Sequence, residues 1–286
     1  MKFKSNETLG IIFAIFAYFS FSILDALQKT AVIHYSIFQL LFIKYTFVLL
    51  LSLIEAKRAK NNNFYRSNNL KLQIIRSILS ILESGFFVLS FKHLSLANAH
   101  SIGALAPIII VVLSVFILNE RVSMKTWIAI FAGFIGVLII IRPASDVFSV
   151  NSFIPLLAAF FLGLYQIATK KMTEYDAPEV SLFYSSLVGI IITSIIAFNF
   201  WQPVNFNSLF LFGPIGLFFS LGIYFQIIAL KNARASIIQP FHYTLIFWAI
   251  IFGFFFYDDI PDLFTIIGAI IITTSGIFVI NQTSKK

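Results

Sequence analysis

The stretch Ala97–Ile141, ANAHSIGALAPIIIVVLSVFILNERVSMKTWIAIFAGFIGVLIII, decides what kind of protein this chain can be. It holds two apolar runs, Ala97–Leu118 and Met124–Ile141, with only the short polar segment Asn119–Ser123 between them. Each run can cross the hydrocarbon core of a bilayer, which is about 30 Å thick and takes roughly 20 residues of α-helix. We therefore expect two membrane-spanning helices joined by a tight loop.

Similar apolar runs recur along the chain and predict ten spans. They are Leu9–Leu27, Ser36–Ile54, Ile74–Leu94, Ala97–Leu118, Met124–Ile141, Val150–Thr169, Val180–Phe200, Leu209–Leu230, Ala235–Phe256 and Leu263–Ile280. Hydrophobic residues make up 59% of the 286 residues and charged residues only 11%, whereas soluble domains carry about 25% charged residues. We predict an all-α polytopic membrane protein whose main partner is the lipid bilayer, with no soluble domain.

The basic residues predict the orientation of these spans. Sixteen of the 20 Lys and Arg residues fall on the side of the N-terminus when ten spans are threaded through the bilayer. The opposite side receives only Lys29, Lys92 and Arg142, and Lys44 lies inside a span. Because cytoplasmic loops carry an excess of Lys and Arg, both termini are predicted to be cytoplasmic. An odd number of spans would destroy this partition.

Several classes of function are disfavoured by what the chain lacks. There is no Cys, which excludes disulfides, thiolate metal sites and cysteine nucleophiles. The four His residues form no H-E-x-x-H or similar pair, so we expect no metal and no other cofactor. The net charge of +8 sits in short loops between apolar runs and is read as an orientation signal, with no nucleic-acid partner.

The two halves of the chain have similar sequence features at corresponding spans. The fourth span is followed by Asn119-Glu120-Arg121 and the ninth by Asp258-Asp259, and the fifth and tenth spans carry small residues such as Gly133 and Gly268. Glu120 and Arg121 are interpreted as residues that cap a helix end, and the glycines as positions for close helix packing. Five spans are an odd number, so residues 1–145 and 146–286 are predicted to form an inverted repeat, the plan of many secondary transporters.

Two segments carry a resemblance to a known family. FKHLSLANAHSIGALAPIIIVVLSVFILNERVSMKTWIAIFAGFIGVLIIIRP (residues 91–143) resembles the first EamA domain of the drug/metabolite transporter superfamily. ALKNARASIIQPFHYTLIFWAIIFGFFFYDDIPDLFTIIGAIIITTSGIFVI (residues 229–280) resembles the second, and DALQK in the first span extends the likeness. The family usually has Arg where this chain has Lys44, and a lysine cannot make the bidentate carboxylate contact of an arginine.

The resemblance implies a secondary carrier of a small molecule, working by alternating access around a central site, in the inner membrane of a bacterium. Within the superfamily the chain most resembles the S-adenosylmethionine uptake carriers of obligate intracellular bacteria. That likeness implies S-adenosylmethionine as the substrate, with exchange for S-adenosylhomocysteine as one mode. Exporters of amino acids and related metabolites belong to the same superfamily and are the alternative. No oligomer is required by this scheme.

Three charged residues inside predicted spans are candidate substrate contacts, because a charge at a helix centre costs about 2.5–3.5 kcal/mol. Asp25 could bind a cationic group or a proton, or could pair with Lys29 or Lys44. Lys44 could hold a substrate carboxylate or act as a counter-ion. Glu83 has no basic neighbour one helical turn away, so its partner comes from another helix or from the substrate. Together they predict a net negative cavity that suits a cation.

Polar and aromatic residues of the second half complete the candidate site, because an onium group sits over aromatic faces and polar side chains are costly in lipid. The candidates are Tyr165, Gln166, Tyr224, Gln226, His242 and Trp248. His100 is expected near the membrane interface instead. Pro107 and Pro240 are predicted to break the fourth and ninth spans beside the cavity, or to kink them without function.

Two other classes of protein, an intramembrane enzyme and a channel, fit the sequence less well than a carrier. An intramembrane enzyme needs a nucleophile–base pair, a metal set or an acid pair, and no catalytic residue is predicted here. A channel needs rings of like residues from an oligomer, whereas this sequence predicts an internal repeat around one site. The chain has no G-x-x-x-x-G-K loop, so ATP is not expected to drive it directly.

Overall fold

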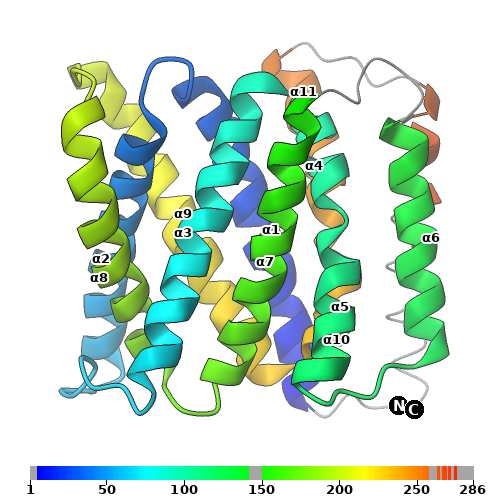
Figure 1. Cartoon of the computed structure of the whole chain (residues 1–286), viewed down its shortest axis with the longest axis horizontal. Coiled ribbons are helices and arrows are strands. Elements are labelled where there is room, and N and C mark those ends of the chain that lie inside the picture. The colour runs from blue at the N-terminus through cyan, green and yellow to red at the C-terminus, as the bar shows by residue number, and fades with distance from the viewer. Residues whose placement is uncertain are drawn as a thin grey trace.

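The computed structural model describes residues 5–141 and 150–257, together with 263–264, 266–268, 270–271 and 274–275. Regular structure in these residues is helical throughout, and the helices stand side by side as a bundle (Figure 1). The elements are α1 (Ser5–Ala31), α2 (Ile37–Arg58), α3 (Leu70–His93), α4 (Leu96–Gly103), α5 (Ala106–Ile117), α6 (Met124–Ile141), η1 (Val150–Ser152), α7 (Phe153–Met172), α8 (Pro178–Ala197), η2 (Phe198–Phe200), α9 (Phe206–Asn232), α10 (Ala235–His242) and α11 (Thr244–Tyr257). The prediction of an all-α fold is confirmed.

The described helices include seven that are long and apolar enough to cross a membrane. They are α1, α2, α3, α7, α8, α9 and the α10–α11 pair taken together. Two shorter apolar helices accompany them, α5 and the Met124–Gly136 part of α6. The first nine predicted spans each coincide with one helix or with a broken pair. Half of the residues of the predicted tenth span, and the motif Asp258–Pro261, lie outside the described residues, so the count of ten stays a prediction.

Helices from the two halves of the chain pack against one another in reverse order. α1 packs along α9, α2 along α8 and α3 along α7. Glycines allow the close approach: a Cβ at Gly10 would lie 2.6 Å from the Cβ of Ala233, and one at Gly189 would lie 2.3 Å from the ring of Tyr45. Small residues serve this purpose in membrane helices generally. The predicted packing role of Gly133 is also confirmed, because a Cβ there would lie 2.5 Å from the ring of Tyr243.

The outer surface of the bundle is apolar. Large side chains such as Phe116, Ile195, Phe210 and Phe255 are exposed along it. A surface of this kind requires lipid as its solvent, because water would not tolerate such contiguous apolar area. The described residues therefore form a multi-pass membrane protein.

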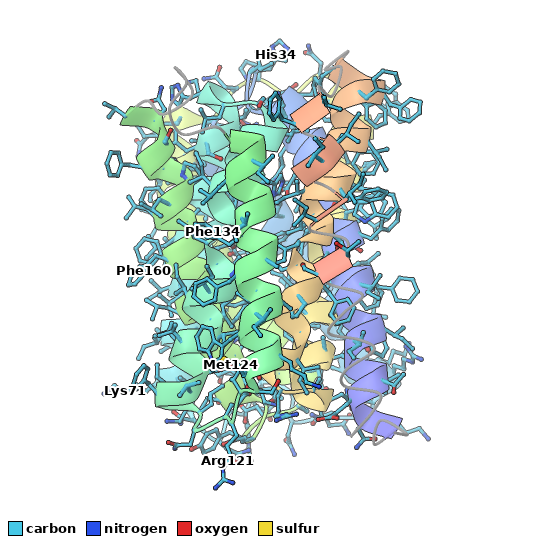
Figure 2. All side chains as sticks on the ribbon, turned by 90° about the vertical axis from the view of Figure 1, so that its right-hand side faces the viewer. His34, Lys71, Arg121, Met124, Phe134 and Phe160 are labelled. Carbon is cyan, nitrogen blue, oxygen red and sulfur yellow. The ribbon has the colours of Figure 1, made fainter. Side chains whose placement is uncertain are left out.

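Basic side chains gather at one end of the bundle. Lys71 and Arg121 lie at the lower end in Figure 2, whereas His34 lies at the upper end. The lower end also holds the turns after α2, α7 and α9, which carry further Lys and Arg residues at their helix ends (Figure 1). The uneven distribution of Lys and Arg that the sequence shows thus corresponds to a difference between the two ends of the bundle.

The two predicted proline breaks coincide with interruptions of the helices. α4 ends at Gly103 and α5 begins at Ala106, with Pro107 in the first turn of α5. Pro240 lies inside α10, which ends at His242, two residues before α11 begins. Proline has no backbone N–H and clashes with the preceding turn, which accounts for the break before Pro107. The break between α10 and α11 instead lies three residues after Pro240, so this clash does not explain it. Each broken pair turns toward the interior of the bundle, where the site described next is found.

Candidate functional site

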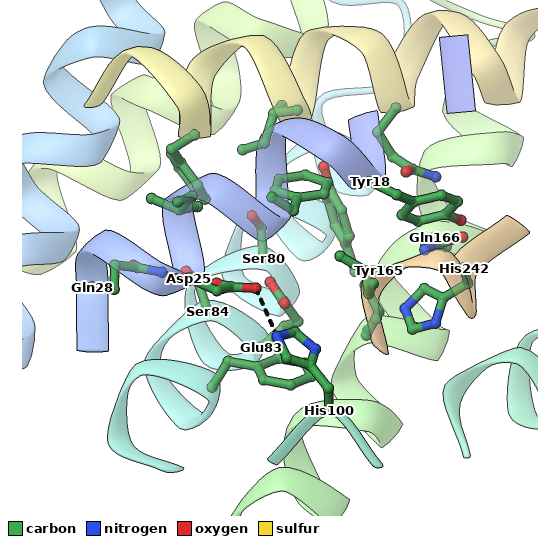
Figure 3. Close-up of a pocket in the computed structure, with 18 residues that line it drawn as sticks. Tyr18, Asp25, Gln28, Ser80, Glu83, Ser84, His100, Tyr165, Gln166 and His242 are labelled. Carbon is green, nitrogen blue, oxygen red and sulfur yellow. Dashed lines mark hydrogen bonds and ion pairs between the residues drawn. The ribbon is translucent and has the colours of Figure 1, made fainter. Parts of the chain in front are cut away.

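A cavity lies inside the bundle between the two halves of the chain (Figure 3). Helices α1, α3 and α4 line it from the first half, and α7, α9, α10 and α11 from the second. The lining residues are Tyr18, Phe21, Leu24, Asp25, Gln28, Ser80, Glu83, Ser84, Phe87, His100, Leu162, Tyr165, Gln166, Phe219, Ile223, Gln226, His242 and Leu245. Two carboxylates, two imidazoles and several amides and hydroxyls therefore converge in an otherwise apolar interior.

The cavity has a volume of about 60 Å³. That is room for only a few water molecules, which need ~15 Å³ each on this measure. Pockets for metabolite-sized ligands run from roughly 300 to 1,000 Å³. As it stands, the cavity is therefore smaller than the pockets that hold such ligands.

One end of the cavity, which we call the acidic end, comprises Asp25, Gln28, Glu83, Ser84 and His100. Nε2 of His100 lies 3.2 Å from Oδ2 of Asp25, the contact marked in Figure 3. Gln28 donates from Nε2 to Oδ1 of Asp25 at 3.0 Å. Both carboxylate oxygens of Asp25 are therefore occupied by neighbouring side chains. Its predicted alternative partner, Lys29, instead lies over the ring of Tyr257, with Nζ 4.9 Å from the ring centroid.

Lys44 lies behind this end of the cavity rather than in its lining. The side chain is fully buried, and Nζ donates to Oε1 of Gln28 at 2.6 Å and to Oγ of Ser84 at 2.5 Å. Nζ also lies 4.4 Å from the centroid of the Phe219 ring. Of the two roles predicted for Lys44, this geometry supports the counter-ion, which compensates the carboxylates through Gln28 and Ser84.

Glu83 differs from Asp25 in having no direct hydrogen bond or ion pair within the described residues, although the charge of Lys44 acts on it through space. Within the part of the chain that the structure describes, its carboxylate makes no hydrogen bond or ion pair. It lines the cavity and is partly exposed to it. A carboxylate in a membrane interior is costly without a partner. Glu83 is therefore the lining group that is best placed to receive a cation or a proton from outside the protein.

The other end, which we call the amide end, comprises Tyr18, Tyr165, Gln166, Gln226 and His242. The hydroxyls of Tyr18 and Tyr165 and both amide atoms of Gln226 are buried and have no hydrogen-bond partner among the described residues. Gln166 accepts a hydrogen bond from Nε2 of Gln239 at 2.9 Å. The ring of His242 meets Tyr18 edge-on, with centroids 5.1 Å apart. Unsatisfied buried polar atoms of this kind are rare, and a ligand could satisfy them.

Two predicted residues lie outside the lining. Tyr224 turns toward α2, where its hydroxyl donates to Oε2 of Glu55 at 2.6 Å. Trp248 packs edge-on against Phe19 at 4.9 Å and is stacked on Phe252. Both were predicted from their residue type, and neither is among the residues that line the cavity. The structure thus brings together Asp25, Glu83, Tyr165, Gln166, Gln226 and His242 from the predicted set.

His100 corrects the sequence analysis, which expected it at the membrane interface. It is 4% exposed and contacts Asp25 within the cavity. The reason is the break before Pro107: α4 is short and packs against α7 and α11, which turns His100 inward. His242 also precedes a break, so each broken helix pair presents one imidazole to the cavity.

Other lining residues escaped the sequence analysis although a signal existed. Tyr18, Phe21 and Gln28 lie three or four positions apart from one another or from Asp25, on the same face of α1. Ser80, Ser84 and Phe87 stand in the same relation to Glu83 on α3. Helical spacing from a charged residue within an apolar run would have found both sets.

Charged side chains fix the turn between α9 and α10, which carries the helix of His242. Lys170 on α7 donates to the carbonyl oxygens of Leu230 and Ala233 at 2.7 and 2.9 Å, at the end of α9. Glu120 accepts from the backbone N–H groups of Ala235 and Ser236 at 2.9 and 3.1 Å, at the start of α10. These charges match the helix dipoles. Glu120 is therefore a cap, as predicted, but of a helix in the other half of the chain.

Among the described residues no group of three His, Cys, Asp or Glu side chains could hold a metal ion. The cavity instead offers carboxylates, amides, hydroxyls and aromatic rings. Such a set binds an organic molecule by charge, hydrogen bonds and stacking.

A comparison with family models identifies a family for this chain. The EamA-like transporter family matches residues 8–142 and again residues 151–282. The chain belongs to the EamA-like transporter family. Its internal cavity is accordingly the candidate binding site of a transporter.

Curated relatives cover nearly the whole chain at low identity. An uncharacterized transporter of Helicobacter pylori is 29% identical over 96% of each chain. The S-adenosylmethionine uptake transporter of Rickettsia prowazekii is 24% identical over 97% of this chain and 94% of its own. The riboflavin transporter of Vibrio cholerae is 24% identical over 100% and 97%. Relatives of similar identity thus carry different substrates.

A solved crystal structure supports the fold. It superposes with a TM-score of 0.80 over 96% of this chain and 98% of its own, at 15% sequence identity. At that identity the likeness concerns the fold alone.

Proposed function

We propose that this EamA-like transporter is a secondary carrier that imports S-adenosylmethionine across the inner membrane of a bacterium. It has no enzymatic activity and works as ten spans in two inverted repeats, residues 1–145 and 146–286. The substrate binds between the repeats, and alternating access moves it across the membrane, in exchange for S-adenosylhomocysteine or without exchange. The basic end of the bundle faces the cytoplasm, as the positive-inside rule requires, and both termini are cytoplasmic.

The observation that carries this proposal is the unpaired carboxylate of Glu83 in a cavity lined by both halves of the chain. S-adenosylmethionine is a sulfonium and an ammonium with one carboxylate, so its net charge is positive. A lining with two carboxylates, and with its lysine set behind it, complements that charge. Apolar walls increase the attraction, because charges interact more strongly away from water.

The aromatic lining supports the same substrate. Phe21, Phe87 and Phe219 line the cavity close to the carboxylates. A sulfonium is an onium group and is attracted to the faces of such rings. The adenine ring can stack on an aromatic side chain and bond to the free amide of Gln226. Relatives named as S-adenosylmethionine uptake transporters add weight to this choice.

The size of the cavity supports alternating access as the mechanism. At about 60 Å³ the cavity is too small for a nucleoside-sized ligand. We interpret the structure as a contracted conformation between two open ones, in which the broken pairs α4–α5 and α10–α11 allow the lining to move. Helix breaks beside a central site are the usual device of secondary transporters.

The test is uptake of labelled S-adenosylmethionine into proteoliposomes loaded with S-adenosylhomocysteine. We expect saturable uptake above empty vesicles, and competition by external S-adenosylhomocysteine. Riboflavin and amino acids are tested as competitors, since relatives in the family carry other substrates. If correctly folded, reconstituted protein takes up no S-adenosylmethionine, the substrate assignment fails; competition by riboflavin alone would replace it. Chemical change of the substrate in detergent, without a second compartment, would indicate an enzyme instead.

A further inference from the structure

Arg76 is a buried cation whose role the proposed site leaves unexplained. The sequence analysis counted it among the basic residues of the cytoplasmic side. In the structure it lies in the second turn of α3 and is 0% exposed. Within the described residues it makes no ion pair. A guanidinium cannot lose its proton in a protein, so a full positive charge stands inside the bundle, near its basic end, without an anion in contact with it.

The hydrogen bonds of Arg76 leave one nitrogen free. Nε donates to Oε1 of Gln73 at 3.3 Å, and Nη2 donates to Oγ of Ser185 at 2.7 Å and to the carbonyl oxygen of Ser181. Nη1 has no partner. The carboxylate of Asp176 reaches Arg76 only through Gln73, which donates to it at 2.9 Å. The network therefore holds the guanidinium in place and leaves Nη1 available.

Tyr165 lies next to the guanidinium of Arg76, and Thr169 lies next to Tyr165 on the same helix, α7. The ring centroid of Tyr165 is 5.8 Å from Cζ of Arg76, and the hydroxyls of Tyr165 and Thr169 are buried without a hydrogen-bond partner. Tyr165 also lines the cavity, as does Ser80, one helical turn beyond Arg76 on α3. Tyr165 thus lies between the cavity, which it lines, and the guanidinium of Arg76.

We propose that Arg76, with the hydroxyls of Tyr165 and Thr169, is a subsite for the carboxylate of a zwitterionic substrate. The inference rests on the proposed transport function and adds the position of the substrate within it. A carboxylate accepts hydrogen bonds from Nη1 and a hydroxyl at once, which satisfies the free donors and neutralises the cation. Arg76 becomes accessible when the contracted cavity opens toward the basic end of the bundle.

The spacing on α3 matches the amino-acid part of S-adenosylmethionine. Arg76 and Glu83 are seven residues apart, or ~10 Å along the helix axis. Three carbon atoms separate the carboxylate carbon from the sulfonium, and both residues reach inward from the helix by their side chains. With the carboxylate on Arg76, the sulfonium comes to the acidic end, and the ammonium lies between the two sites.

The test compares S-adenosylmethionine with its decarboxylated form, which keeps the sulfonium, the amine and the adenosine. Binding to the purified wild-type protein is expected to be at least ~10-fold tighter for the carboxylated form, as for one charge-assisted contact. Arg76→Gln should reduce that ratio to within ~2-fold, and Arg76→Lys should keep part of it. Arg66→Gln, which removes an exposed arginine from the loop before α3, is the matched control and should leave the ratio unchanged.

The wild-type ratio alone decides the matter if the Arg76 variants fail to fold. Equal binding of the two compounds to wild-type protein, or an unchanged ratio in folded Arg76→Gln, overturns the subsite. If neither compound binds, the substrate assignment fails, and acetate then probes the subsite by itself. A rise in thermal stability with acetate that Arg76→Gln lacks supports the subsite in that case, and no such rise overturns it.

Discussion

The acidic end and the amide end of the cavity differ in how their polar atoms are satisfied. At the acidic end Asp25 is bound by His100 and Gln28, and Gln28 is in turn held by Lys44. At the amide end Gln226 and the hydroxyl of Tyr18 have no partner among the described residues. The first end is largely organised by the protein itself, with Glu83 as the exception. The unpartnered polar atoms of the amide end can form hydrogen bonds only with a ligand or with water.

This contrast separates two contributions to binding. A preorganised charge costs nothing to orient when the substrate arrives, so it supplies most of the affinity. Unpartnered amides and hydroxyls destabilise the empty protein. They add binding free energy only for a ligand that forms hydrogen bonds with them, so they supply selectivity. Substitutions at the two ends should therefore affect stability and transport differently.

The largest effect is expected for Glu83→Gln. Its carboxylate makes no direct hydrogen bond or ion pair in the described structure, so a cationic substrate loses the counter-charge that is most accessible to it. We expect kcat/KM for uptake to fall at least ~100-fold, which corresponds to about 3 kcal/mol. Thermal stability should be unchanged or higher, because a buried charge is removed. Uptake in proteoliposomes is the measurement, and Glu174→Gln at an exposed position is the control. Wild-type uptake by Glu83→Gln would contradict this assignment.

A smaller effect is expected at Asp25, because its charge is shared with His100. Asp25→Asn should lower kcat/KM about 10-fold and should also destabilise the protein by ~1–2 kcal/mol. His100→Gln tests the sharing. The double variant should be less impaired than the sum of the two single variants, since the residues act as a pair. Strict additivity in uptake and in thermal unfolding would show that the contact of 3.2 Å has no energetic weight.

At the amide end, two glutamines should behave in opposite ways. Gln226→Met removes two unpartnered atoms, so it should raise the free energy of unfolding by about 1 kcal/mol while weakening substrate binding about 5-fold. Gln166→Met removes the acceptor of Gln239, so it should lower the free energy of unfolding by a similar amount. Thermal unfolding and ligand binding of both variants check this pair. Equal loss of stability in both would remove the proposed distinction between the ends.

The smallest effect is expected outside the cavity. Tyr224→Phe breaks the hydrogen bond to Glu55, and Trp248→Phe alters the contact with Phe19, but neither side chain lines the cavity. We expect KM for uptake to stay within ~2-fold of wild type for both, with a loss of about 1 kcal/mol of stability for Tyr224→Phe. A larger change in KM would mean that these residues meet the substrate in an open conformation.

The sequence predicted the elements of this fold well, because length and apolarity determine a membrane helix almost by themselves. The proline positions also marked the two interruptions. Less predictable was the course of the chain beside them: His100 was placed by counting along a straight helix, and the break before Pro107 makes that count wrong.

For the candidate site, the sequence predicts how far along its span a residue lies. It does not predict toward which side of the helix the side chain points. Asp25 and Glu83 were found because a carboxylate in an apolar run is costly and must face inward. Tyr224 and Trp248 carry no such cost, since aromatic side chains are stable against lipid, so their residue type could not tell which way they point. Lys44 was found in the same way, yet only its hydrogen bonds to Gln28 on α1 and to Ser84 on α3 show that it supports the lining from outside.

The reverse pairing of helices has a consequence for the synthesis of the protein. The partner of α1 is α9, which the ribosome completes long after α1. At about 5–20 residues per second, α1 waits on the order of ten seconds or more with its partner still unmade. During that delay Asp25 can meet His100, because α4 is made well before α9, but the wall of the cavity that the second half supplies is still missing. Chains that stop before α9 therefore keep the carboxylates of Asp25 and Glu83 in a cavity that lacks the residues of α9, α10 and α11, and a carboxylate with an incomplete surrounding is costly in lipid.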